Sequence, residues 1–156
     1  LTALKALLDR QEQIQKQGTS ISTDIEADPL AVWRTIADIH FRLGQWQDAA
    51  NAYQTCLNDN LNSENVLKQY FKTLEKLEDW PTALDVLGKL IQLTGESPMY
   101  LNAIGTILLR MQEYEAALQT YLQLNRLQPE VIETRRKIAS LYAKTGKLDE
   151  AQKWLL

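Results

Sequence analysis

The chain has only one cysteine and one histidine in 156 residues, Cys56 and His40. A single cysteine excludes an internal disulfide and a cysteine-based zinc cage, and a single histidine excludes a multi-histidine metal site. Glycine (6) and proline (4) are also scarce, which fits long helices better than a fold with many tight turns. No glycine-rich loop that could cradle a phosphate is present. We therefore expect no cofactor and no resident metal ion.

The sequence also lacks a strong charge excess and a long apolar run. Its 17 Lys and Arg residues against 20 Asp and Glu residues give a net charge of -3, which argues against a DNA-binding protein. No apolar run approaches the about 20 residues needed to span a bilayer, so we expect no membrane insertion. With 45% hydrophobic residues, the chain can bury a core without disulfides.

The two ends of the chain resemble interior positions of a protein. The chain begins at Leu1 rather than at Met and ends at Leu156 inside an amphipathic pattern. We expect a longer protein that continues, or that self-associates, at the C-terminal end, because an interrupted repeat leaves an apolar side uncovered. The compartment stays open: we favour the cytoplasm, and the periplasm or another compartment is the alternative.

A period of about 34 residues is the main signal in the sequence. Small residues recur at this spacing: Ala49, Ala83, Ala117 and Ala151. An aromatic residue or a leucine stands three positions before each of them: Trp46, Trp80, Tyr114 and Leu148. A further, mostly apolar column contains Trp33, Leu67, Leu101 and Arg135. Four units align without a gap, over 30–63, 64–97, 98–131 and 132–156, and such units bury their apolar faces only against neighbours.

Each unit predicts a pair of helices. In the first unit, apolar and small residues follow the i, i+3, i+4, i+7 spacing of one helical face from Trp33 to Leu43, and Gly44 permits the left-handed residue that ends a helix. A second amphipathic stretch runs from Trp46 to Leu57. Helix starts are marked by capping oxygens and first-turn prolines at Asp28-Pro29, Ser63 and Ser97-Pro98.

The unit length and the columns resemble the tetratricopeptide repeat (TPR) family, whose hallmark is W-x2-L-G-x2-Y, then A-x3-F, then P. The first unit matches this hallmark at Trp33, Ile36, Ala37, Gly44, Ala49 and Tyr53. The third unit matches it at Leu101, Ile104, Gly105, Ala117, Tyr121 and Pro129. The second and fourth units depart from it at Phe71, Gly95 and Arg135. The resemblance covers about residues 30–156, with the last unit truncated, and implies an all-α fold: an α-α superhelical solenoid of tetratricopeptide-type helix pairs.

Residues 1–17 form one more amphipathic helical pattern. Its apolar side consists of Leu4, Leu7, Leu8 and Ile14. Ala3 and Leu7 have the A-x3-F spacing, so the segment is either the second helix of a preceding repeat or an unrelated capping helix. Residues 18–29 are mostly polar and predict a linker.

Neither His40 nor Cys56 has the surroundings that catalysis requires. No Ser or Cys nucleophile shares the helix face of His40 at a useful spacing, so we interpret it as a core histidine with a hydrogen-bond partner. Cys56 has no flanking cation or metal partner, which favours a buried, inert thiol. The resemblance likewise implies a scaffold for protein–protein interaction without enzymatic activity.

On the first helix of each unit, the face opposite the core columns is predicted to line a concave groove. Of its 24 positions, nine are basic: Arg34, Arg42, Lys68, Lys72, Lys76, Arg110, Arg136, Lys137 and Lys144. Three are acidic: Asp38, Glu75 and Glu133. The residues expected to contact a partner are Arg34, Phe41, Arg42, Lys68, Gln69, Lys72, Met99, Asn102, Thr106, Leu109, Arg110, Arg136 and Lys137.

A basic groove in an acidic chain selects a protein or peptide that is acidic or has a free carboxylate. Some members of the resembled family clamp the carboxylate tail of heat-shock chaperones. We reject that specificity here, because Asp38, Met99 and Ala103 stand where the clamp requires amide or basic side chains.

Two other functions stay open at this point. A helical-repeat RNA-binding module is the first, although Phe41 is the single aromatic residue of the predicted groove and the net charge is negative. A regulatory or localisation segment of a larger enzyme is the second.

Overall fold

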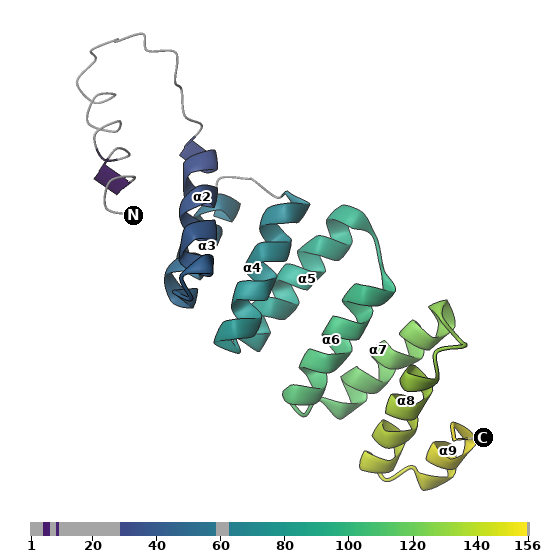
Figure 1. Ribbon diagram of the computed structural model, residues 1–156. Helices are drawn as coiled ribbons and strands as arrows, with labels where there is room; N and C mark the ends of the chain where they lie inside the picture. The colour runs from purple at the N-terminus through teal and green to yellow at the C-terminus, as the bar shows by residue number, and fades with distance from the viewer. Residues whose placement is uncertain (1–4, 7–8, 10–28, 59–62, 156) are drawn as a thin grey trace. The chain divides into compact units, whose positions relative to one another are not determined.

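The computed structural model describes residues 5–6, 9, 29–58 and 63–155 of the chain. Over these residues it contains helices and turns and no strand (Figure 1). The helices are α2 (Pro29–Arg42), α3 (Trp46–Asn58), α4 (Glu64–Leu77), α5 (Trp80–Thr94), α6 (Pro98–Arg110), α7 (Tyr114–Leu127), α8 (Ile132–Lys144) and α9 (Leu148–Lys153). The all-α prediction is confirmed.

The chain divides into two compact units, Leu1–Asp79 and Trp80–Leu156, and each is described by itself. Helices α2 to α4 belong to the first unit and helices α5 to α9 to the second. The predicted repeat boundaries do not coincide with this division, and they stay a prediction. The helix predicted over 1–17 and the linker predicted over 18–29 lie mostly outside the described residues.

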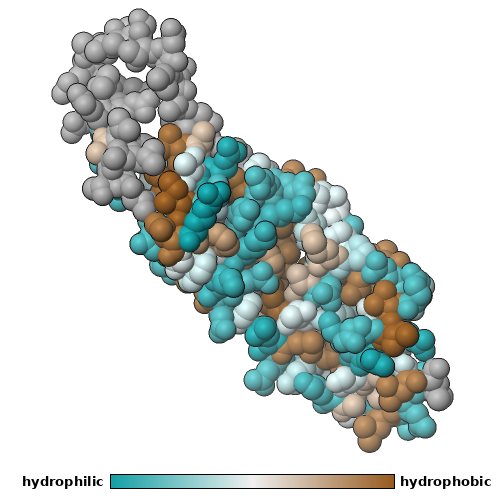
Figure 2. Space-filling view, in the orientation of Figure 1, coloured by the Kyte–Doolittle hydropathy of each residue, from teal (hydrophilic) through white to brown (hydrophobic). Residues whose placement is uncertain are grey.

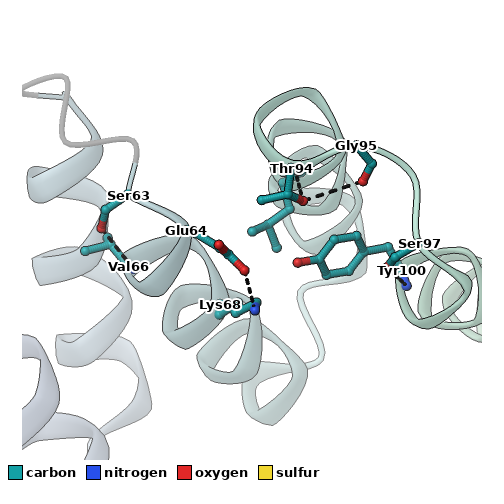
Figure 3. Close-up of polar contacts among 9 residues, drawn as sticks. Ser63, Glu64, Val66, Lys68, Thr94, Gly95, Ser97 and Tyr100 are labelled. Carbon is teal, nitrogen blue, oxygen red and sulfur yellow. Dashed lines mark hydrogen bonds and ion pairs between the residues drawn. The ribbon is translucent and has the colours of Figure 1, made fainter.

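Two serines cap the helices that follow them, as expected from the sequence (Figure 3). The Ser63 hydroxyl accepts a hydrogen bond of 3.3 Å from the backbone N–H of Val66 at the start of α4. The Ser97 hydroxyl accepts a bond of the same length from the backbone N–H of Tyr100 in α6, whose first residue is Pro98. Each cap satisfies a backbone donor that the first helical turn leaves unpaired.

The turns between the helices of a pair share one backbone conformation. Positions 44, 78, 112 and 146 recur with the period of the repeat, and all four have positive φ angles, of 72°, 56°, 62° and 78°. In each turn, the following backbone N–H donates to the carbonyl five residues earlier, over 2.8 to 3.1 Å. Glycine occupies two of these positions, whereas Glu78 and Gln112 adopt the left-handed conformation with a side chain.

Small residues let the paired helices approach closely. Ala49 in the first unit and Ala117 in the second are completely buried. Gly105 on α6 faces the Tyr121 ring of α7 so closely that a Cβ atom at position 105 would lie 2.7 Å from Tyr121 Cζ. The core around this contact in the second unit consists of Leu101, Ala117, Leu118, Tyr121, Leu124, Ile138 and Leu141.

Candidate functional site

A groove of about 350 Å³ lies in the second unit, between α6 and α8 and beside the end of α7. Its lining residues are Pro98, Met99, Asn102, Leu124, Gln128, Val131, Glu133, Thr134 and Lys137. Met99, Asn102 and Lys137 are among the residues predicted to contact a partner. The sequence reasoning missed Val131 and Gln128, because they lie at the α7–α8 connection, where no helical period indicates which side chains line a groove.

Lys137 is held in place within this groove by two neutral groups. Its Nζ atom donates to Asn102 Oδ1 over 3.3 Å and lies 5.0 Å from the centre of the Tyr121 ring. Tyr121 is completely buried, and its hydroxyl oxygen lies 3.2 Å from Thr106 Oγ1. The ammonium group is therefore positioned from two sides by contacts that leave its charge uncompensated.

No acidic side chain of the described residues forms an ion pair with Lys137. Glu133 lies one helical turn before it on α8 and also lines the groove, but the two do not approach to ion-pair distance. Lys137 is half-buried, so its charge is less solvated than that of a freely exposed lysine. An anionic group that enters the groove would find a pre-positioned cation.

Apolar surface adjoins this cation. The side chain of Met99 is 60% exposed, although it lies at the groove. Hydrophobic surface also lies over the α7–α8 connection (Figure 2), where Leu127 and Ile132 are exposed. The groove therefore has the opposite charges of Lys137 and Glu133 in its lining, beside apolar side chains that are exposed among the described residues of this unit.

Comparison with known proteins identifies the repeat. Residues 100–131, which include most of α6 and all of α7, match the family model of the tetratricopeptide repeat. Residues 100–131 are a tetratricopeptide repeat. The family resemblance of the sequence and the fold class of tetratricopeptide-type helix pairs are thereby confirmed. A comparison with curated protein sequences finds no match.

Solved structures share this tetratricopeptide fold. The crystal structure of MamA has 20% sequence identity and a TM-score of 0.65, and the alignment covers 83% of this chain and 77% of MamA. MamA AMB-1 has 17% identity and a TM-score of 0.69, with 99% of this chain and 82% of that chain covered. YrrB, described as a TPR protein with an unusual peptide-binding site, has 19% identity and a TM-score of 0.60, with coverage of 79% and 63%. At these identities the likeness shows the fold.

In the second unit, most of the other residues predicted to contact a partner take part in packing. Thr106 Oγ1 donates to the carbonyl of Asn102 over 2.8 Å, and Leu109 packs against the core cluster. The Arg110 guanidinium lies 5.2 Å from the centre of the Trp80 ring. Arg136 is exposed.

In the first unit, the predicted contact residues are less closely associated with one another. Lys68 forms an ion pair of 2.5 Å with Glu64 on the same helix (Figure 3), and Phe41 packs edge-on against Trp46 with ring centres 5.2 Å apart. The remaining members are exposed or half-buried without further ring contacts or ion pairs among the described residues: Arg34, Arg42, Gln69 and Lys72.

The residues considered for chemistry have ordinary surroundings. His40 Nδ1 lies 2.6 Å from Gln45 Oε1, and Cys56 is completely buried. Within the described ranges, no three His, Cys, Asp or Glu side chains are grouped so that they could hold a metal ion. The same residues include no helix that is long and apolar enough to cross a bilayer.

Proposed function

We propose that the chain is a non-catalytic protein-interaction scaffold, and that it binds a peptide in the groove between α6 and α8. The tetratricopeptide fold supports a scaffold for protein interaction, and YrrB, which shares the fold, is described as having a peptide-binding site. The single observation that carries the proposed site is Lys137, a half-buried cation held by Asn102 and the Tyr121 ring without an acidic partner among the described residues.

The chemistry of the groove defines the peptide. The Lys137 ammonium group has three donors, of which Asn102 takes one, so the others can bind a carboxylate. This carboxylate belongs to an aspartate or glutamate side chain, or to the C-terminus of the partner. Met99 and Val131, on the same groove, provide an apolar surface for a neighbouring side chain. The preferred ligand is therefore an acidic residue beside an apolar residue.

The restricted position of Lys137 determines how much free energy its contact with a carboxylate contributes to binding. A freely exposed ion pair contributes only about 0.2 to 1 kcal/mol, partly because two long side chains lose their freedom. The Tyr121 ring and Asn102 already restrict Lys137 before a ligand arrives. A carboxylate bound here incurs less of this entropic cost, and the half-buried position reduces screening by water.

Peptide selection with matched variants tests the proposal. A random peptide library is selected on the protein, and the affinity of the selected peptides is measured by fluorescence anisotropy. We expect enrichment of acidic residues, or of a free C-terminal carboxylate, next to apolar residues. Lys137→Met keeps an apolar stem over Tyr121 and should weaken binding at least fivefold, whereas Lys89→Met, at an exposed site on α5, should change it less than twofold. Equal affinities of the two variants would contradict the site.

A further inference from the structure

The groove between α6 and α8 contains a carboxylate as well as the Lys137 ammonium group. Glu133 lines it from the first turn of α8, and this residue is exposed. The two charged residues are four positions apart, so both lie on one face of the helix. The α6 side of the groove contributes no charge, because its lining residues are Pro98, Met99 and Asn102.

Both charges are available to a ligand. On an isolated helix, a glutamate four positions before a lysine commonly pairs with it. Here Asn102 and the Tyr121 ring hold the ammonium group of Lys137 instead. In the part of the chain that the structure describes, no basic side chain lies within ion-pair distance of Glu133. The packing of α8 therefore leaves two opposite charges one helical turn apart in one groove, each without an ionic partner among those residues.

Glu133 also lies where a carboxylate can stabilise a helix. The first turn of α8 carries the partial positive charge of a helix N-terminus, and its N-cap, Val131, forms no side-chain cap bond. Glu115 has the same place in the first turn of α7, but it does not line the groove. A comparison of Glu133 with Glu115 therefore separates an effect on the helix end from an effect on the groove.

We infer that the groove recognises a peptide with one acidic and one basic residue, which bind Lys137 and Glu133 respectively. This inference rests on the proposed peptide site and adds a second charge to its ligand. Neighbours on one side of an extended peptide are two residues, or roughly 6.6 Å, apart, which is close to the spacing of about 5 to 6 Å between Cβ atoms one helical turn apart. The two charged residues of the peptide are therefore separated by one residue.

The carboxylate of Glu133 also discriminates against a uniformly acidic peptide. A second acidic residue at this position would place two like charges side by side, whereas Lys or Arg would form an ion pair with Glu133. Selective binding sites commonly combine such a repulsive contact with an attractive one. The expected preference at this peptide position is therefore basic over neutral, and neutral over acidic.

Selection of the random peptide library on matched variants tests the second charge. The unmodified chain should enrich Lys or Arg two positions from the acidic residue. Glu133→Gln should keep the enrichment of the acidic residue and lose that of the basic one, and Glu133→Lys should select a second acidic residue in its place. Glu115→Gln, which removes an exposed first-turn carboxylate outside the groove, should select the same pair as the unmodified chain.

Affinities of one selected peptide provide the second measurement. Replacement of its basic residue by glutamine should weaken binding to the unmodified chain about threefold, as expected for an exposed ion pair, and binding to Glu133→Gln less than about 1.5-fold. Equal weakening in both proteins would overturn the inference.

The selection separates failure of this inference from failure of the proposed function. Acidic enrichment without basic enrichment on the unmodified chain would overturn the inference and leave the proposed function intact. Basic enrichment that persists on Glu133→Gln, or that is lost on Glu115→Gln, would also overturn the inference. The absence of acidic enrichment on the unmodified chain would contradict the proposed function, and this inference with it.

Discussion

Tyr53 and Tyr121 occupy equivalent positions two repeats apart, and each uses its hydroxyl group to bind the first helix of its own pair. Tyr53 donates to Asp38 Oδ1 over 2.5 Å, and the Tyr121 hydroxyl pairs with Thr106 Oγ1 over 3.2 Å. Asp38 and Thr106 are likewise equivalent positions of the first and third repeats. Asp38, which the sequence placed in the groove as a negative charge, therefore has a structural partner.

Burial of Tyr53 makes the stability of the protein sensitive to high pH. Burial raises the pKa of Tyr53, and the hydrogen bond to Asp38 and the Asp38 charge raise it further. The folded chain keeps this proton above pH 10, whereas an unfolded tyrosine, with a pKa of about 10, loses it. Stability is thus fully present below pH 10 and falls by roughly 1 kcal/mol per pH unit above it.

Urea unfolding at pH 9 to 11.5 checks this expectation. Tyr53→Phe should give a shallower loss of stability above pH 10 than the unmodified chain. Some slope should remain, because burial also raises the pKa of Tyr70. The same slope in both chains would show that Tyr53 ionises normally.

The contact of Gly105 with Tyr121 gives a second prediction at the residue scale. Gly105→Ala places a Cβ atom 2.7 Å from Tyr121 Cζ, so the ring must move, together with its contacts to Thr106 and Lys137. We expect a net destabilisation of roughly 1 to 3 kcal/mol in chemical denaturation. The matched control is Gly88→Ala on α5, where no atom lies within 4 Å. It should be neutral or stabilise by up to about 1 kcal/mol, since alanine favours helix.

At the scale of the elements, the turn inside each helix pair is defined by one left-handed residue. Glu78 and Gln112 adopt this conformation at a steric cost of about 1 kcal/mol that glycine avoids. Glu78→Gly and Gln112→Gly should therefore each raise the free energy of unfolding by up to about 1 kcal/mol, measured by urea denaturation. Glu113→Gly, at a neighbouring position with φ of -81°, should bring no gain. Destabilisation by Gln112→Gly would contradict the strained turn.

The helix pairs could be predicted from the sequence because their signals are local and periodic. The alanine column marks buried crossing points, and Ser63 and Ser97 mark helix starts. The ring contacts of the basic residues could not be predicted in this way. Arg110 stacks on Trp80, which lies at the start of another helix, and a helical wheel of α6 contains no information about that ring.

The candidate site was predicted only in part for the same reason. Helical spacing placed Met99 and Asn102 on the groove-facing side of one predicted helix and Lys137 on the same side of another. The structure brings these three residues to one groove. The contact between the Tyr121 ring and the Lys137 ammonium group depends on the packing of α7 against α8, and the residue spacing within one helix does not reveal it. That these three and the other predicted residues contact a partner stays a prediction.

At the scale of the whole molecule, the basic residues on the first helix of each repeat do not form one uniformly positive surface. Several of these cations are already engaged within the protein: Lys68 by Glu64, and Arg110, Lys137 and Lys144 by aromatic rings. A surface of separate contacts on a chain of net charge -3 suits a peptide with few acidic groups better than a nucleic-acid backbone.

Salt dependence distinguishes these two ligands. Binding of an acidic peptide through one ammonium group should weaken less than about tenfold between 50 and 200 mM salt. A groove with five phosphate contacts to single-stranded RNA would lose about a hundredfold over the same range. Fluorescence polarisation with a labelled selected peptide and a labelled oligouridine measures both. Tight, steeply salt-dependent binding of the oligouridine would favour the RNA-binding function.

The two cation–ring contacts at the helix ends have a consequence for how unequal recombination can change the number of repeats that the gene encodes. Arg110 lies over Trp80 and Lys144 over Tyr114, and in both cases the cation follows its ring at the same sequence separation. A crossover that removes residues 98–131 would bring Lys144 to the position relative to Trp80 that Arg110 now occupies. The shortened chain would thus keep a cation at the same sequence separation from the Trp80 ring, so this contact does not depend on which of the two units follows.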